Sequence, residues 1–333
     1  MRPEKTSPVK PGKKIALLGA STLDGQRVRE ALEGARVPGR MVDLFDHSDE
    51  EMLLGEYAGE ARVIQNPDTE EIAGHGVVLV CGAGSGVERV LEHVGTSLVI
   101  DVVGAFPEGA SSRLVRPGEG EIEDLTGLFR VPHPMALVLS DLLRPIDGGP
   151  GIDEAVAVVL RPAADYGQAG VDELRQQTVR LLNFVEMPVE TFGRQLAFNI
   201  VPEQGLSCSV PGQEALIGRQ VAELLGWDRE RLALRFLAAP LFYGHAMELR
   251  LRTPNGAGLD EVREALREAG LEPQAGAGPL ISTPMDVADE RVIRVGDLSV
   301  DGLGGVWLWA VAGRSGTRAA ELAVDLARRA IGL

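Results

Sequence analysis

KIALLGASTLDG, residues 14–25, is the stretch of this 333-residue sequence that decides its fold class. An apolar run over residues 14–18 meets Gly19, and an amphipathic stretch from Asp24 to Glu33 follows and ends at Gly34. A strand, a glycine turn and a helix in this order are typical of a parallel sheet whose strands are joined by helices.

The pattern of the opening stretch repeats through the first part of the chain. Further strands are predicted over residues 41–45, 62–64, 77–80 and 97–103, with a helical pattern from Gly86 through Val94. Several of these strands are apolar throughout rather than alternating. Continuous apolar strands between helices predict a parallel sheet that is covered on both faces.

After about residue 130 the hydrophobic pattern changes to one with alternating strands. Strands are predicted over residues 155–160, 232–238, 247–252 and 306–310, and helices over 137–143, 171–182 and the C-terminal stretch. Alternation indicates strands with one covered face. The sequence therefore predicts a second domain with a mixed or antiparallel sheet, which agrees with a length of about two domains.

Composition and charge exclude several functional classes. The net charge of −16 opposes binding to phosphate backbones and anionic lipid, so we expect no nucleic-acid and no membrane partner. Two cysteines cannot form a disulfide framework. The basic residues 1–12 read as a flexible tail without the apolar segment of a signal peptide. We expect a cytoplasmic protein.

The glycine turns of the first domain are candidates for a dinucleotide site. Gly19 and Gly25 flank the first strand–helix turn, and Asp46 follows Gly25 by 21 residues. Such sites use glycine to let backbone N–H groups approach a pyrophosphate, and an acid about 20 residues on to hold the ribose. The second turn adds Gly82 and Ser85 at the end of a buried strand.

This first turn leaves two alternatives open. Its spacing departs from the usual G-x-G-x-x-G, and Asp24 stands where its carboxylate would face the phosphate. The turn either retains dinucleotide binding, or it is a steric feature in which Asp24 caps the helix. The cofactor therefore stays open between NAD, NADP and none.

Other kinds of site are not indicated by the residue pattern. None of the five histidines has metal-ligand spacing with another histidine or a cysteine, so no metal site is expected. No G-x-S-x-G segment is present. Cys81 ends a buried strand and reads as a core residue, and Cys208 has no basic neighbour that would lower the pKa of its thiol.

Several segments, in order along the chain, resemble the aspartate-semialdehyde dehydrogenase family, whose fold the acetylglutamyl-phosphate reductases share. The matching segments are Ile100-Asp101 with Ala105-Phe106, Ala197-Phe198-Asn199-Ile200-Val201-Pro202, Pro240-Leu241-Phe242-Tyr243-Gly244-His245, Thr283-Pro284-Met285-Asp286 with Val295-Gly296, and Val306-Trp307-Leu308-Trp309-Ala310-Val311-Ala312. The resemblance implies an α/β fold with a Rossmann-like dinucleotide-binding domain over residues 13–130 and 313–333. It implies a mixed-sheet α+β dimerisation domain over residues 131–312.

The resemblance also assigns site residues. His245 falls on the family's acid–base histidine, whereas Pro134 falls on the nucleophilic cysteine. Ala238 replaces the arginine that holds the substrate carboxylate, Leu216 replaces a lysine, and Pro107 replaces the phosphate-binding arginine. Without a thiol at this position the family's covalent route is closed, because its first step is attack by a thiolate.

Three functional hypotheses follow from this comparison. The first is a catalytically degenerate paralogue, similar to Usg-type proteins, that acts as a homodimeric binding or scaffold protein. The second is an NAD(P)-dependent oxidoreductase of altered, non-covalent chemistry on an aldehyde or related carbonyl, with His245 as the acid–base group. The third is a partner subunit that forms a heterodimer with an active paralogue.

Overall fold

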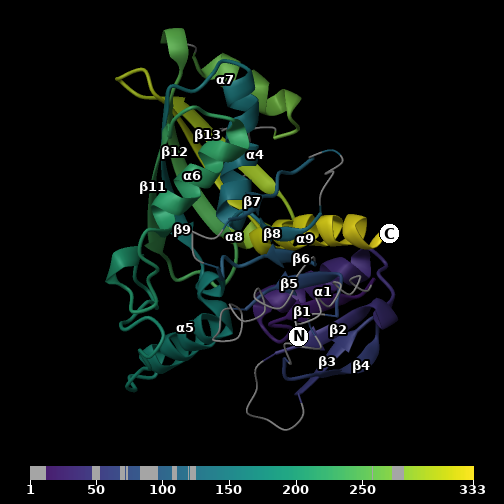
Figure 1. Ribbon diagram of the computed structural model, residues 1–333. Coiled ribbons are helices and arrows are strands. Elements are labelled where there is room, and N and C mark those ends of the chain that lie inside the picture. The colour runs from purple at the N-terminus through teal and green to yellow at the C-terminus, as the bar shows by residue number, and fades with distance from the viewer. Residues whose placement is uncertain are drawn as a thin grey trace, which may run out of the picture. The chain divides into compact units, whose positions relative to one another are not determined.

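The computed structural model describes residues 13–46, 53–67, 72, 74–82, 97–106, 111–118, 120, 125–256, 258–271 and 281–333. The chain forms two compact units, Met1–His133 with Gly316–Leu333, and Pro134–Ser315 (Figure 1). We call them unit 1 and unit 2. The predicted flexible tail over residues 1–12 and the predicted helix from Gly86 through Val94 lie outside the described residues.

Unit 1 contains a six-stranded sheet in the order β2-β1-β5-β6-β8-β7, in which every pair is parallel. Its strands are β1 (Ile15–Leu18), β2 (Val42–Phe45), β5 (Val77–Val80), β6 (Leu98–Asp101), β7 (Arg113–Leu114) and β8 (Gly127–Arg130). All residues of β1, β5 and β6 are buried. The parallel sheet expected from these apolar runs is confirmed.

Helix α1 (Leu23–Gly34) follows β1 and buries Val28, Ala31 and Leu32. Its N-cap is Thr22, whose side chain accepts a hydrogen bond from the N–H of Gly25. Asp24 is therefore not the N-cap that one of the two alternatives for this turn made it. Asp24 lies in the first turn, where its negative carboxylate stabilises the helix by interacting with the positive end of the helix dipole. The same carboxylate forms an ion pair with Arg27 at 2.7 Å.

Two further elements complete the description of unit 1. Helix α9 (Ser315–Ile331) has a buried, mostly small-residue face that includes Ala319, Ala323 and Leu326, as the 3.6-residue spacing predicts. The strand expected over residues 62–64 is β4 (Glu60–Ile64), but it pairs antiparallel with β3 (Leu53–Tyr57) in a separate two-stranded sheet. The short turn at 58–59 explains this hairpin, since parallel neighbours need a long crossover.

Unit 2 is built on a mixed six-stranded sheet in the order β10-β11-β9-β12-β14-β13. Its strands are β9 (Glu154–Arg161), β10 (Val201–Pro202), β11 (Leu232–Ala238), β12 (His245–Arg252), β13 (Ile293–Val300) and β14 (Val306–Ala312). The β9–β11 pair is parallel and the other pairs are antiparallel. The predicted mixed sheet is confirmed.

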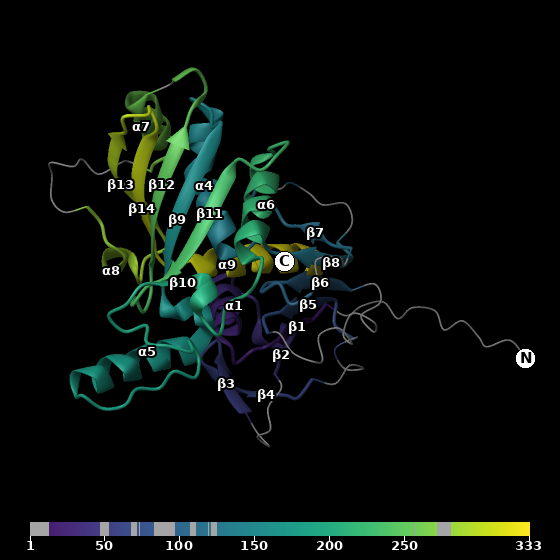
Figure 2. The same ribbon diagram turned by 90° about the vertical axis from the view of Figure 1, so that its left-hand side faces the viewer.

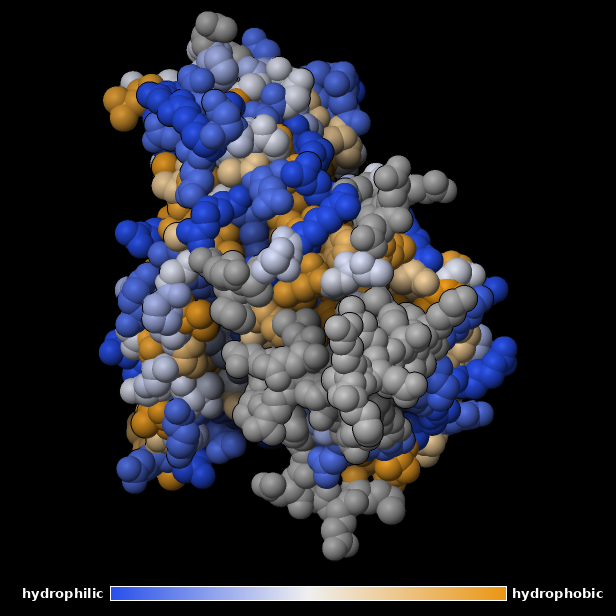
Figure 3. Space-filling model, viewed as in Figure 1, coloured by the Kyte–Doolittle hydropathy of each residue, from blue (hydrophilic) through white to orange (hydrophobic). Residues whose placement is uncertain are grey.

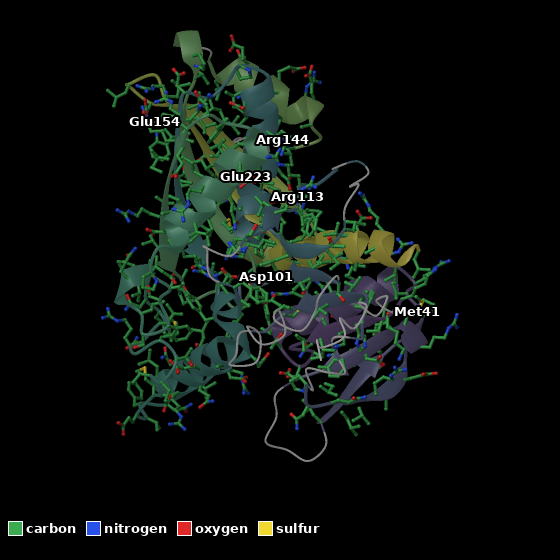
Figure 4. All side chains as sticks on the ribbon, viewed as in Figure 1. Met41, Asp101, Arg113, Arg144, Glu154 and Glu223 are labelled. Carbon is green, nitrogen blue, oxygen red and sulfur yellow. The ribbon has the colours of Figure 1, made fainter. Side chains whose placement is uncertain are left out.

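Helices of unit 2 cover one face of this sheet (Figure 2). They are α4 (Pro134–Gly148), α6 (Gln213–Leu225) and α7 (Leu259–Glu268), whereas α5 (Gly167–Leu182) lies beyond the end of the sheet and the short α8 (Pro284–Val287) packs on the other face. Arg144 of α4 donates to the carbonyl oxygen of Leu224 at 3.1 Å, which ties α4 to α6 (Figure 4). Helix α7 buries Val262 and Leu266, and the surface above it is mainly hydrophilic (Figure 3).

Apart from Val287 of α8, which packs on one end of it, the other face of the mixed sheet is uncovered by the described helices, and Figure 2 looks onto it. Strand β9 alternates between buried and half-buried residues. The half-buried set includes Val156, Val158 and Leu160, and on β14 it includes Trp307 and Trp309. Strand β12 adds the charged Glu248 and Arg250 to this outer face between these apolar residues, and no element of the described chain covers the whole face as a layer. None of the described helices is long and apolar enough to cross a membrane.

Candidate functional site

The glycines predicted for a dinucleotide site meet at the carboxyl ends of β1 and β5. A Cβ atom on Gly19 would lie 2.6 Å from the backbone nitrogen of Gly82, and Gly19 has a φ of +78°. A Cβ atom on Gly25 would lie 2.1 Å from the carbonyl oxygen of Gly19. Gly19 and Gly25 therefore require glycine for close backbone approach, and a Cβ atom on Gly82 would lie 3.2 Å from Cα of Gly19. Ser85 lies outside the described residues.

Thr22 is a residue of this turn that sequence reasoning missed. Its Oγ1 atom lies 2.8 Å from the carbonyl oxygens of Gly19 and Cys81, and it accepts from the N–H of Gly25 at 3.0 Å. One hydroxyl thus joins β1, β5 and the start of α1. The sequence signal was present, because threonine is a preferred N-cap directly before an acidic first turn.

Asp46 lies beside the same turn, as its spacing predicts. Its carboxylate accepts from the backbone N–H of Ser21 at 2.9 Å and from the Ser21 hydroxyl. A carboxylate here fits the ribose hydroxyls of NAD, provided that they replace the Ser21 hydroxyl. It does not fit the 2′-phosphate of NADP, because both groups are negative.

Asp101 is the buried acid of a segment that matched the family pattern. It is fully buried at the end of β6 (Figure 4) and accepts from the N–H groups of Val103, Ala105 and Phe106. The carboxylate therefore fixes the backbone that follows β6. Its role here is to position this loop.

The second candidate region lies in unit 2 around His245, the first residue of β12. His245 is 4% exposed, and its Nε2 atom lies 2.9 Å from Oδ2 of Asp165. The Nδ1 atom lies 3.5 Å from Oγ of Ser315. Both ring nitrogens of His245 therefore have partners within unit 2.

Arg161, at the end of β9, connects His245 to a larger buried network. Its Nε donates to Oδ2 of Asp165 at 2.8 Å, and one terminal nitrogen contacts Glu203 at 3.1 Å and Gln213 at 2.7 Å. The Tyr166 hydroxyl donates to the second oxygen of Glu203 at 2.6 Å. The guanidinium also lies 5.0 Å from the Tyr166 ring centroid. A buried cation is thus neutralised by carboxylates of its own unit.

The ion pairs of this network keep Asp165 ionised. Burial by itself raises the pKa of the Asp165 carboxyl, but the neighbouring His245 and Arg161 outweigh burial and hold that pKa far below its ordinary value. The same carboxylates raise the pKa of Arg161 against the opposing effect of burial. Sequence reasoning missed Asp165, Glu203 and Tyr166, because their contacts join segments that are far apart in the chain.

Burial raises the pKa of both thiols of the chain. Cys81 is 2% exposed, and burial raises the pKa of its thiol well above the ordinary value. Burial also raises the pKa of the half-buried Cys208. Cys81 is thus the core residue that its sequence context predicts. Thiolate, the reactive form, is scarce at both positions.

The remaining positions assigned by the resemblance are apolar, and one of them, Pro107, lies outside the described residues. Pro134 is the first residue of α4, where its missing N–H leaves no helical hydrogen bond unmade. Ala238 is fully buried in β11, and Leu216 lies half-buried on α6. Among the described residues no cluster of histidine, cysteine and acidic side chains could hold a metal ion.

Comparison with known proteins identifies relatives along nearly the whole chain. No protein-family model matches. The chain is 23% identical over 325 residues to aspartate-semialdehyde dehydrogenase 2 of Vibrio cholerae, covering 94% of this chain and 96% of the relative. It is 26% identical over 271 residues to a USG-1 protein homolog of Azotobacter vinelandii, and the match covers 78% of this chain and 79% of the relative.

Solved structures agree with these relatives. Aspartate semialdehyde dehydrogenase II of Vibrio cholerae, complexed with ASA, superposes with a TM-score of 0.79 over 95% of this chain and 97% of that chain, at 23% identity. The aspartate semialdehyde dehydrogenase of Candida albicans with NADP superposes with a TM-score of 0.65 at 16% identity, and the match covers 96% of this chain and 99% of that chain. The chain is therefore a homologue of proteins named aspartate-semialdehyde dehydrogenase and of a USG-1 protein homolog, and it has the aspartate-semialdehyde dehydrogenase fold.

Proposed function

We propose that this protein is a catalytically degenerate homologue of aspartate-semialdehyde dehydrogenase that acts in the cytoplasm as a dimeric binding or scaffold protein. The observation that carries the proposal is the raised pKa of its two cysteine thiols. The family resemblance implies a cysteine thiolate that attacks an aldehyde or acyl-phosphate carbonyl. This chain has only two cysteines, and both have a raised pKa.

Neither cysteine has a setting that would activate it. Cys81 follows a buried strand, where the negative charges of Asp24 and Asp101 further oppose its ionisation. Around Cys208 burial raises the thiol pKa more than any nearby group lowers it. An activated thiol needs a helix N-terminus or a cationic neighbour to lower its pKa. This argument does not depend on how the segment around Pro134 is aligned.

The substrate-binding positions support the same conclusion. The residues at the positions of the family's anion-binding groups, Ala238 and Leu216, carry no charge. Arg161, the nearby buried cation, already neutralises Asp165 and Glu203. A carboxylate or phosphate ligand would need a cation that is not already neutralised.

The uncovered face of the mixed sheet supports the dimeric part of the proposal. Val156, Val158, Leu160, Trp307 and Trp309 share this face and are half-buried within one chain. These apolar side chains surround the charged Glu248 and Arg250 of β12, and apolar side chains exposed on a sheet face favour association. A second copy of this chain presents the identical face, which is the condition for a two-fold symmetric contact.

The test measures semialdehyde oxidation together with thiol accessibility. We expect no turnover with NAD or NADP, and iodoacetamide should label both cysteines in urea but leave Cys81 unlabelled in the folded protein. The variant Pro134→Cys should remain inactive, because the anion-binding positions stay uncharged. Turnover in the unmodified protein that is lost in Cys208→Ser would overturn the proposal.

A second candidate function is favoured by the close approach of Gly19, Gly25 and Gly82. This geometry suits an NAD-dependent oxidoreductase of altered, non-covalent chemistry on an aldehyde or related carbonyl. When bound, NAD would supply hydride transfer. Asp46 would hold the ribose and His245 would move a proton at its ring nitrogen.

Thermal unfolding with about 1 mM NAD or NADP, and ATP as a control, separates the two candidates. A Kd near 10 μM adds about 2.7 kcal/mol of stability at a hundredfold excess of ligand. A shift with NAD alone supports the second candidate. No shift with either dinucleotide favours the scaffold, and an active dehydrogenase that co-purifies with the chain would identify a heterodimer.

A further inference from the structure

Three polar side chains of unit 2 form a continuous line through His245. Asp165 Oδ2 lies 2.9 Å from Nε2 of His245, and Ser315 Oγ lies 3.5 Å from Nδ1 of the same ring. His245 is buried, whereas Asp165 and Ser315 are both half-buried. A carboxylate, an imidazole and a hydroxyl thus lie in sequence, with the buried imidazole in the middle.

The contacts determine which nitrogen of neutral His245 carries the proton. Asp165 is paired with Arg161 and its carboxylate only accepts hydrogen bonds, so in the neutral form of His245 the Nε2 atom carries the proton and donates to Asp165. Nδ1 then has its lone pair directed at Ser315, whose hydroxyl is the donor of that contact. Arg161 donates to the same Oδ2 atom and fixes the carboxylate in place.

The backbone around Ser315 is a tight turn from a strand into a helix. Ser315 is the first residue of α9 and is separated from β14 by Gly313 and Arg314 only. A Cβ atom on Gly313 would lie 1.6 Å from the carbonyl oxygen of Val287, and Arg314 has a φ of +40°. This strained turn places the hydroxyl at a helix N-terminus, where developing negative charge is favoured.

We propose that Ser315 is a nucleophile for acyl transfer from carboxylic esters, with His245 as its general base and Asp165 as the residue that orients His245. This activity goes beyond the proposed binding or scaffold function and uses no thiol. A hydroxyl nucleophile that contacts a base, which is in turn oriented by a third group, is the arrangement that such chemistry requires.

The reaction balances with an ester and water alone. The oxygen of Ser315 bonds to the ester carbonyl carbon while its proton passes to Nδ1 of His245, and the carbonyl π electrons move to the carbonyl oxygen. The carbon–oxygen bond to the alcohol then breaks, and His245 returns the proton to the leaving alcohol. Water cleaves the acyl-serine by the same sequence and releases the carboxylic acid.

The test uses p-nitrophenyl acetate as the ester. We expect release of p-nitrophenol and an acetyl group that peptide mapping places on Ser315. Ser315→Ala should abolish the labelling and lower the rate at least about 100-fold, the lower range of what an assisting base contributes. Ser209→Ala, which changes another half-buried serine of unit 2, is the matched control and should leave the rate unchanged.

A second measurement keeps the proposal testable if acetyl-serine hydrolyses too fast to detect. A fluorophosphonate forms a stable bond to an activated serine with loss of fluoride, and it should label the unmodified protein but not Ser315→Ala or His245→Gln. Circular dichroism confirms that each variant is folded. Equal labelling of Ser315→Ala and the unmodified protein, or acetylation confined to lysine or cysteine, would overturn the proposal.

Discussion

Nε2 of His245 lies 2.9 Å from Oδ2 of Asp165, although 80 residues separate them along the chain. His245 begins β12, and Asp165 lies in the short 3₁₀ helix η2 (Ala163–Tyr166) directly after β9. Because β9 and β12 are antiparallel neighbours, the end of one strand lies beside the start of the other. The sheet register therefore creates this contact.

The first prediction concerns the buried cation of the network. Arg161→Met should lower the free energy of unfolding by about 3–5 kcal/mol, because Asp165 and Glu203 lose their buried counter-charge. Urea unfolding measures the change. Arg235→Met is the control, since Arg235 pairs with Glu214 at the surface and should contribute about 0–1 kcal/mol. Equal losses in both variants would contradict the buried network.

The second prediction concerns stability in acid. Burial by itself raises the pKa of Asp43, but hydrogen bonds from Lys14 and His75 outweigh it, so this pKa is lowered. A lowered carboxyl pKa stabilises the fold above the unfolded value of about 3.9. That contribution is lost as the pH falls below about 4 and through the folded pKa.

Unfolding by urea between pH 7 and pH 2 tests the role of Asp43. The loss of stability in acid should be smaller in Asp43→Asn than in the unmodified protein, while Asp153→Asn, at an exposed position, should leave it unchanged. An acid dependence that is identical in all three proteins would show that the Asp43 cluster does not contribute.

The third prediction concerns the first glycine turn. Gly25→Ala should destabilise unit 1 by about 1–3 kcal/mol, because the new Cβ atom would lie 2.1 Å from the carbonyl oxygen of Gly19. Gly34→Ala is the matched control at the other end of α1, where nothing lies within 4 Å of the new Cβ atom. Its stability should be unchanged or slightly higher. Chemical unfolding that ranks the two variants in the opposite order would contradict this packing.

The fourth prediction concerns self-association. Val156→Glu places a carboxylate on the uncovered sheet face beside Arg250, its register partner on β12, so the fold should tolerate it. The charge should weaken a dimer formed through this face, and sedimentation velocity should show a shift toward monomer. Leu303→Glu, at the 88% exposed tip of the β13–β14 hairpin, is the control. A dimer that persists in Val156→Glu would place the interface elsewhere.

Local sequence patterns predicted most of the strands correctly, because burial periodicity is a local property. They missed the partner of β4, since the apolar alternation of β3 (Leu53–Tyr57) is interrupted by Gly55. They also missed β13, whose pairing with β14 shifts register between Gly296 and Ser299. Bulges and glycines weaken the two-residue period on which such predictions depend.

For the candidate sites too, the sequence identified the residues that depend on local spacing and missed those that depend on strand pairing. Gly19, Gly25 and Asp46 were predicted from spacing, because strand, turn and helix follow one another along the chain. Thr22 was not predicted, although its hydroxyl contacts backbone oxygens of two strands. Its contact with Cys81 depends on the pairing of β1 with β5, which a local pattern does not specify.

By itself, the sequence determined the α/β class, the two sheets and the absence of a cysteine where the family resemblance places one. Only the tertiary structure decided which partners the charged and nucleophilic side chains contact and which of their charges are neutralised. It placed Asp165 and Ser315 on opposite nitrogens of His245, and it neutralised Arg161 with Glu203. Strand periodicity is local, whereas burial and ion pairing depend on which distant segments the sheet register brings together.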